Sequence, residues 1–193
     1  MKYYEIINQG SKILKLNKIK SSSLDSEILL SSLLNLDRSR LIINHNSNVS
    51  NDKKKFFFNL INRRKNNEPI SYITGYKDFW NNSFKVDKNV LIPRPDTETI
   101  VEQVLNYLTL LSTKKILDIG TGSGCIIISI LKERKKCKGI GIDISKNAIK
   151  LAKYNAKIQH IENRIKFLNS DIDNLYGDKY DLIISNPPYI KLH

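Results

Sequence analysis

The residues best suited to bind a ligand lie in the stretch Ile116–Cys125, which reads Ile-Leu-Asp-Ile-Gly-Thr-Gly-Ser-Gly-Cys. Its short apolar beginning is typical of a buried parallel strand. The alternating glycines let a turn of backbone approach a ligand closely and take positive φ. The apolar run Ile126–Leu131 predicts a helix that starts at the ligand. We therefore expect a nucleotide-like ligand to be held by the five turn residues, Gly120, Thr121, Gly122, Ser123 and Gly124.

The spacing of these glycines restricts the ligand. The dinucleotide fingerprint requires G-x-G-x-x-G, and Cys125 stands one place short of a further glycine, so NAD and FAD fit poorly. Asp118, just before the turn, also disfavours a pyrophosphate. A carboxylate there suits a cationic group, such as the ammonium of an amino acid.

Strand-like and helix-like patterns alternate from Lys115 onward, with strands expected at 116–119, 139–143, 165–168 and 180–185. Ser145 is the expected N-cap of the helix after the second of these strands. This alternation predicts a parallel sheet with right-handed crossovers, whose ligands bind beyond the carboxyl ends of the strands.

Polar side chains follow three of these strands. Asp143 could accept hydrogen bonds from ribose hydroxyls, and Asp171 could accept one from an adenine amino group, although a helix cap explains Asp171 equally well. Together with Asn186, they should converge on the glycine turn.

The segment Asn186-Pro187-Pro188-Tyr189 points to a second kind of chemistry. Prolines donate no backbone hydrogen bond, so the loop is rigid and presents carbonyl acceptors. Asn186 adds an acceptor, and Tyr189 adds a flat apolar face. Such a loop suits a planar NH2 group attached to a carbonyl or an aromatic ring.

The preceding chain predicts a small helical domain followed by a hairpin. Helical patterns occur at 3–16, 24–34, 37–43 and around Phe56–Arg64, with serines 21–23 and Ser50 as N-caps and Asn67 in a left-handed C-cap. Asn81-Asn82 is the expected hairpin turn, and Asp96 or Thr97 the cap of the next helix.

Composition sets broader limits. The 193-residue chain carries a net charge of +13, which invites a nucleic-acid partner. The excess of lysine, asparagine and isoleucine is also what an AT-rich coding sequence produces. Cys125 and Cys137 have no metal or redox spacing. Neither a signal peptide nor a long apolar run is present, so we expect a cytoplasmic protein.

Several of these motifs resemble those of a known family. Ile116–Cys125 is similar to the first motif of class I S-adenosylmethionine methyltransferases, and Asn-Pro-Pro-Tyr to the loop of those that methylate amide or exocyclic amino nitrogens. Ile92–Glu98 together with Asn186–Ile190 resembles the release-factor glutamine methyltransferases, the PrmC/HemK family. Asp25–Leu30 and Arg63–Gly75 resemble that family's helical domain and linker.

The resemblance implies S-adenosylmethionine as cofactor, no metal, and the glutamine of the Gly-Gly-Gln motif of peptide chain release factors as substrate. Family members often carry an aromatic residue where Ile172 stands, which implies weaker stacking on adenine here. The implied cofactor residues are Asp118, Gly120, Thr121, Gly122, Ser123, Gly124, Asp143, Asp171, Ile172 and Asn186. The implied catalytic residues are Asn186, Pro187, Pro188 and Tyr189.

The expected fold is α/β, a Rossmann-like class I methyltransferase sheet with about four strands. We expect a helical substrate-recognition domain at 1–68, a linker with a β-hairpin at 69–95 and the catalytic domain at 96–193. Because such sheets continue beyond the fourth strand in the family, we expect the chain to be truncated at its C-terminal end and to have little activity alone. Leu182–Ile184 would then form an exposed apolar edge.

Two alternatives remain open. The first is methylation of adenine or cytosine amino groups in DNA, which would use the basic charge but normally needs a target-recognition domain. The second is a protein that binds the cofactor without catalysis.

Overall fold

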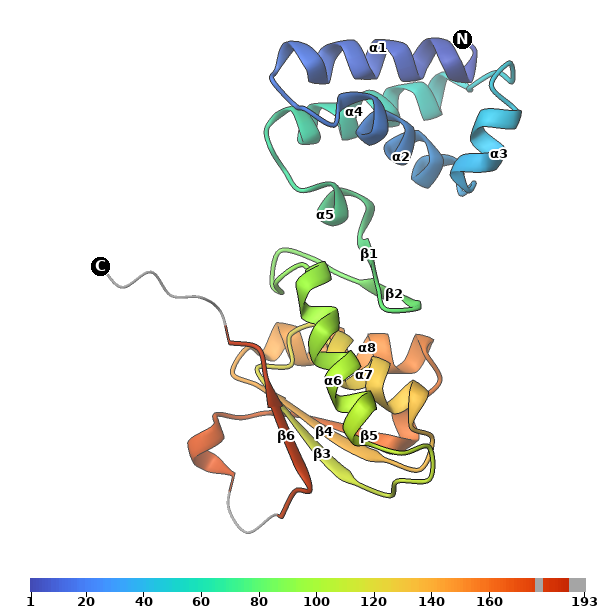
Figure 1. The fold of residues 1–193 in the computed structure, drawn as a ribbon. Helices are drawn as coiled ribbons and strands as arrows, with labels where there is room; N and C mark the ends of the chain where they lie inside the picture. Colours follow the sequence, from blue (N-terminus) through green and yellow to red (C-terminus); the bar gives the residue numbers. More distant parts are fainter. Residues whose placement is uncertain (176–178, 188–193) are drawn as a thin grey trace. The chain divides into compact units, whose positions relative to one another are not determined.

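The computed structural model describes residues 1–175 and 179–187. The chain divides into two compact units, Met1–Gly75 and Tyr76–His193, which Figure 1 shows as a helical part and a part that contains the sheet.

The first unit is helical, as predicted. It contains α1 (Tyr3–Leu16), α2 (Ser22–Leu34), α3 (Arg38–Ile43), α4 (Asn51–Lys65) and α5 (Ile70–Thr74). Its core is apolar and includes Ile6, Leu29 and Phe57. Ser50 caps α4 by accepting the Lys53 N–H, and Asn67 takes positive φ (65°) after the helix, so both predictions are confirmed. Ser21 stands at the N-cap of α2, but its hydroxyl makes no capping bond.

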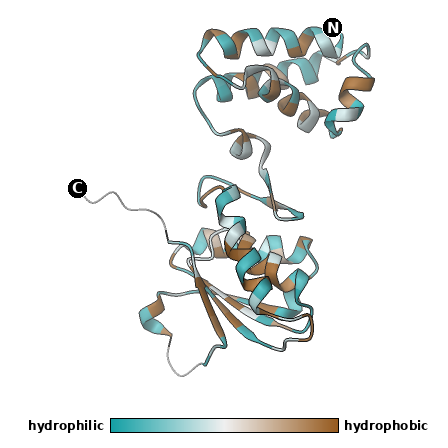
Figure 2. Ribbon diagram, in the orientation of Figure 1, coloured by the Kyte–Doolittle hydropathy of each residue, from teal (hydrophilic) through white to brown (hydrophobic). Residues whose placement is uncertain are grey.

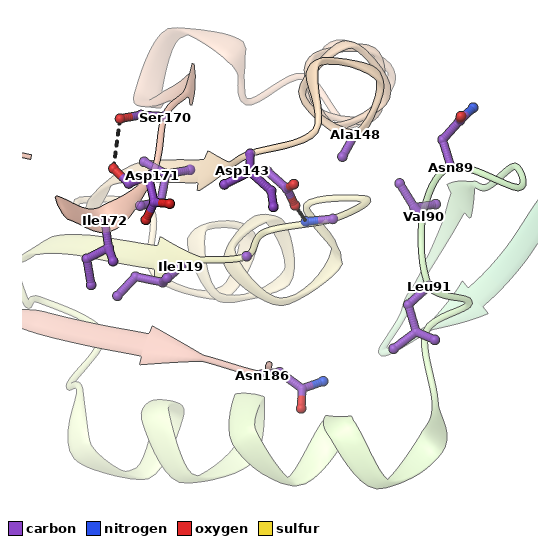
Figure 3. Close-up of a pocket in the computed structure, with 14 residues that line it drawn as sticks. Asn89, Val90, Leu91, Ile119, Asp143, Ala148, Ser170, Asp171, Ile172 and Asn186 are labelled. Atoms are coloured by element: carbon purple, nitrogen blue, oxygen red, sulfur yellow. Dashed lines mark hydrogen bonds between the residues drawn. The ribbon is translucent and has the colours of Figure 1, made fainter. Parts of the chain in front are cut away.

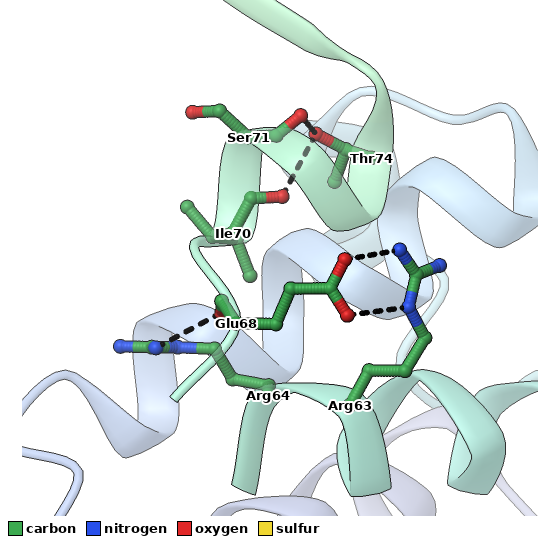
Figure 4. A network of polar contacts seen from close by, with 6 residues as sticks. All are labelled: Arg63, Arg64, Glu68, Ile70, Ser71 and Thr74. Carbon is green, nitrogen blue, oxygen red and sulfur yellow. Dashed lines mark hydrogen bonds and ion pairs between the residues drawn. The ribbon is translucent and has the colours of Figure 1, made fainter. Parts of the chain in front are cut away.

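A buried ion pair joins α2 to α4. Asp25 is only 4% exposed, and its Oδ2 accepts from Arg64 Nε at 2.6 Å and from Ser21 Oγ at 2.9 Å. Asp25 lies in the first turn of α2, and the sequence analysis made no prediction about its burial. Figure 4 shows the end of α4, where Arg63 forms an ion pair with the Glu68 carboxylate (Nε to Oε2, 2.8 Å). Arg64 donates to the Glu68 carbonyl at 3.1 Å.

The second unit begins with a hairpin of β1 (Tyr76–Phe79) and β2 (Asn82–Lys85). Phe79 pairs with Asn82, so the turn residues are Trp80 and Asn81 rather than the predicted Asn81-Asn82. Trp80 takes positive φ (50°), as the first residue of a two-residue hairpin turn does, and it is also bonded to two distant acids. Its backbone N–H donates to Glu98 Oε1 at 2.7 Å, and its indole N–H donates to Glu133 Oε1 at 3.1 Å.

The sheet is parallel, as predicted. Its described strands are β3 (Lys115–Ile119), β4 (Lys138–Asp143), β5 (Ile165–Asn169) and β6 (Leu182–Ser185), in the order β5-β4-β3-β6. Numbered along the chain within the sheet, that order is 3-2-1-4, which agrees with the first four strands of a doubly wound α/β fold. Register pairs Ile119 with both Ile142 and Ser185, so the strands end together.

Three helices cover one face of this sheet: α6 (Glu98–Tyr107), α7 (Cys125–Glu133) and α8 (Lys146–Ile158) (Figure 1). Ser145 caps α8 by accepting the Ala148 N–H, as predicted. The predicted side-chain cap of α6 is absent, because a 3-10 turn, η1 (Pro95–Thr97), leads directly into that helix. Two further 3-10 turns are η2 (Glu162–Arg164) and η3 (Ile172–Asn174).

β6 lies last in the described strand order and is apolar along most of its length (Figure 2). Ile184 packs into the core beneath the helices, whereas Ile183 is 58% exposed. No helix within residues 1–175 or 179–187 is both long and apolar enough to cross a membrane.

Candidate functional site

A cavity of about 410 Å³ lies at the carboxyl ends of the strands, and we call it the main cavity of the candidate site (Figure 3). That volume falls within the range of small-molecule sites. It brings together several predicted residues and others that the sequence did not single out. The lining residues are Asn89, Val90, Leu91, Ile119, Gly120, Gly122, Ile142, Asp143, Ile144, Ala148, Ser170, Asp171, Ile172 and Asn186.

The glycines of the turn after β3 have different surroundings. Gly120 and Gly122 line the cavity at φ of 70° and 55°, and a Cβ on Gly120 would meet no atom within 4 Å. The space beside Gly120 is therefore room for a ligand. Gly124 does not line this cavity; a Cβ there would lie 2.9 Å from Ile128 Cδ1. Gly124 thus permits close packing at the start of α7, while its predicted cofactor contact stays a prediction.

Asp143 is held by two backbone amides. Its Oδ2 accepts from Gly122 N at 3.0 Å, and its Oδ1 accepts from Ser145 N at 2.8 Å. A carboxylate has about four acceptor positions, so further hydrogen bonds to a ligand remain available on the cavity side. The two amides fix the orientation of the acid before any ligand binds.

Asp118 lies beneath the glycine turn rather than in the cavity wall. It is 1% exposed, and Thr121 Oγ1 donates to its Oδ2 at 2.7 Å. The pKa of Asp118 is raised from 3.8 to about 7, chiefly by burial; the Thr121 bond opposes this rise, and the nearby charge of Asp143 contributes to it. Its predicted contact with a cationic ligand group stays a prediction.

Apolar side chains form the walls on either side of Asp143. Ile172, which was predicted, is 48% exposed; Ile144 and Leu91, which were missed, are 77% and 57% exposed. Figure 3 shows Ile172 and Leu91 on opposite sides of the cavity. The sequence did hold a signal for Ile144, because an isoleucine between the polar residues Asp143 and Ser145, directly after a strand, lies where a ligand would bind.

Asn186 lines the main cavity and also a smaller hollow of about 60 Å³. The smaller hollow is bordered by Thr121, Ser123 and the segment 91–94 with Thr97. Asn186 Nδ2 donates to Thr97 Oγ1 at 3.3 Å, so the two proline-containing motifs meet here. Pro187 is exposed, whereas Pro188 and Tyr189 lie outside the described residues.

A buried amide supports the site from α8 and was not predicted. Asn155 Nδ2 donates to the carbonyls of Ser123 (2.8 Å) and Lys85 (3.0 Å), and its Oδ1 accepts from Lys85 N at 2.8 Å. One side chain therefore ties the glycine turn to β2. Among residues 1–175 and 179–187, no three His, Cys, Asp or Glu side chains are arranged to hold a metal ion.

Two family models together match most of the chain. Residues 5–75 match the family described as PrmC N-terminal domain, and residues 96–192 match the family described as methyltransferase small domain. The chain is 46% identical over 178 residues to the release factor glutamine methyltransferase of Buchnera aphidicola subsp. Baizongia pistaciae. It is 41% identical over 194 residues to the protein of that name from Clostridium acetobutylicum.

These matches cover nearly the whole chain, 92% and 99%, but only 64% and 68% of the two relatives. The chain thus spans about two thirds of their length. Among solved structures, that of the ribosomal protein L11 methylase from Lactobacillus delbrueckii subsp. bulgaricus aligns with a TM-score of 0.43 and 24% identity. It covers 49% of this chain and 47% of that protein. On the two sequence families and the relatives together, the chain belongs to the release factor glutamine methyltransferase family.

Proposed function

We propose that this chain binds S-adenosylmethionine in the main cavity and methylates the side-chain amide nitrogen of the glutamine in the Gly-Gly-Gln motif of peptide chain release factors. The observation that carries the proposal is the place of Asn186 in the wall shared by the main cavity and the smaller hollow. A residue in a shared wall can contact a cofactor on one side and an acceptor group on the other. Because release factors act on ribosomes, we place this activity in the cytoplasm.

The residues of the main cavity fit this cofactor. Asp143, already oriented by Gly122 and Ser145, can accept hydrogen bonds from the ribose hydroxyls. The exposed side chains of Ile144 and Ile172 provide apolar surfaces for the adenine ring. When bound, S-adenosylmethionine supplies an electrophilic methyl group on a sulfonium.

Asp171 and the open side of Gly120 complete the proposed cofactor site. Asp171 is exposed and lines the cavity, where its carboxylate can accept from the adenine amino group. The space beside Gly120 can receive the amino-acid end of the cofactor. Asp118 is buried behind Thr121, so it would act on that end of the cofactor through its charge only when its carboxyl is ionised.

The acceptor side must compensate for a weak nucleophile, because the lone pair of an amide nitrogen is delocalised. Asn186 Oδ1 and the Pro187 carbonyl can each accept one hydrogen of the substrate NH2 group. These bonds strengthen as positive charge develops on the nitrogen, so they stabilise the transition state more than the bound substrate. They also orient the nitrogen in line with the transferred methyl group. Pro188 and Tyr189 would complete this loop as rigid spacer and stacking surface.

Labelled S-adenosylmethionine offered with a release factor and with double-stranded DNA tests the proposal. We expect label on the release factor and none on DNA. The matched control is a release factor whose Gly-Gly-Gln glutamine is replaced by alanine, which should stay unlabelled. Label on DNA would favour amino-group methylation of bases, and binding of S-adenosylmethionine without transfer to either acceptor would favour a non-catalytic protein.

A further inference from the structure

The side chain of Asn186 contacts a residue 89 positions earlier in the chain. Its Nδ2 donates to Thr97 Oγ1 at 3.3 Å, and both residues border the smaller hollow. Asn186 and Thr97 are both half-buried. The contact therefore lies in the wall of the hollow that we assign to the acceptor amide.

Thr97 is well placed to hold another side chain because its own backbone is fixed. It ends the 3-10 turn η1, which begins at Pro95, and its N–H donates to the Arg94 carbonyl at 3.1 Å. The ring of Pro95 restricts φ at the start of that turn. The next residue, Glu98, accepts from the Trp80 backbone N–H at 2.7 Å, which ties the same turn to the hairpin.

In this structure the nitrogen end of the Asn186 amide faces Thr97. With Nδ2 directed at Thr97, Oδ1 has no hydrogen-bond partner among residues 1–175 and 179–187. An acceptor role requires the oxygen, because a nitrogen end would set one NH2 group against another. A side-chain amide that rotates freely would present its oxygen for only part of the time.

We propose that Thr97 is a positioning residue for Asn186, which holds the amide so that Oδ1 faces the NH2 group to be methylated. The proposal rests on the proposed function for the value of that orientation, but the contact itself is independent of activity. Thr97 borders the hollow, but the role proposed for it is to hold the Asn186 amide and not to contact the reacting atoms.

The test uses three variants of the full chain. Thr97→Val removes the hydroxyl and keeps the shape of the side chain, while Thr97→Ser keeps the hydroxyl. Thr99→Val is the matched control, since Thr99 Oγ1 donates only to the Asp96 carbonyl (2.7 Å) in the same turn. Kinetic constants are measured with S-adenosylmethionine and a release factor. The side-chain amide resonances of Asn186 are followed by NMR and assigned by their loss in Asn186→Ala.

We expect Thr97→Val to lower kcat by roughly fivefold to tenfold, the effect of one hydrogen bond, with KM for S-adenosylmethionine unchanged. The Asn186 amide resonances should shift and exchange faster with water. Thr97→Ser should restore kcat to within about twofold of the wild type, and Thr99→Val should leave both kcat and the resonances unaltered. The split between kcat and KM separates positioning from a general loss of structure.

Two results would overturn the inference. If the parent protein is active and Thr97→Val has the same kcat as the parent, the positioning role is refuted. The proposed function is then unaffected. Should the parent transfer no methyl group to the release factor, the proposed function fails, and the NMR comparison decides the contact. Unchanged Asn186 resonances in Thr97→Val would then refute it.

Discussion

The backbone N–H of Gly122 donates to Asp143 Oδ2 at 3.0 Å, and this bond fastens the turn after β3 to the end of β4. Ser145 N holds the other carboxylate oxygen at 2.8 Å. The acid and the turn are thereby set in place together, so a ligand that contacts both meets a preorganised surface. Preorganisation lowers the entropic cost of binding.

Replacing Asp143 by alanine should weaken S-adenosylmethionine binding by about 1.5–3 kcal/mol, the range for hydrogen bonds to a charged group. Titration calorimetry measures this loss directly. Asp52→Ala, an acid-to-alanine change in the first turn of α4, serves as control and should leave the affinity unaltered. Equal affinity in Asp143→Ala and the parent would place the cofactor elsewhere.

Asp118 should make stability depend on pH. Its pKa is raised from 3.8 to about 7 in the folded chain, so the folded state binds more protons than the unfolded state between these values. The stabilisation from the protonated carboxyl is complete below about pH 4 and is lost as the pH rises through about 7.

Asp118→Asn keeps an oxygen for the Thr121 hydroxyl and removes the titration. Urea unfolding, followed by the fluorescence of Trp80, the single tryptophan, compares the two proteins. The variant should gain on the order of 3 kcal/mol relative to the parent between pH 4 and pH 8. A difference that stays constant with pH would mean that Asp118 has an ordinary pKa.

Asn155→Ala should destabilise the second unit by about 2–4 kcal/mol, because the Lys85 and Ser123 backbone groups lose their partner. Asn147→Ala is the matched control on the same helix. Asn147 is exposed and makes one side-chain bond, to Asn89 at 3.2 Å, so its loss should cost less than about 0.5 kcal/mol. Similar urea midpoints for the two variants would contradict the role given to Asn155.

The sheet could be predicted because local patterns determine it. Apolar runs, the glycine turn and the Ser145 cap lie within a few residues of what they form. The same reasoning placed Asp143, Asp171 and Asn186 at strand ends, and the structure brings them to one cavity.

The features that the sequence did not reveal depend on distant partners. The hairpin turn is displaced by one residue, and its Trp80 bonds to Glu98 and Glu133, contacts that no local turn preference reflects. Asp25 is buried because Arg64, 39 residues away, neutralises it. The clamp by Asn155 likewise joins groups that are far apart in sequence.

The central claim is that Asn186 holds an amide nitrogen for methylation. Mass spectrometry of the Gly-Gly-Gln peptide, after incubation of a release factor with S-adenosylmethionine and either the parent chain or Asn186→Ala, tests it most directly. We predict one added methyl group on the glutamine with the parent, and turnover lower by about 10²–10³ with the variant, as for loss of one oxyanion-type contact. Cofactor affinity, measured by calorimetry, should be nearly equal in the two. Methylation by Asn186→Ala at the parent's rate would contradict the account.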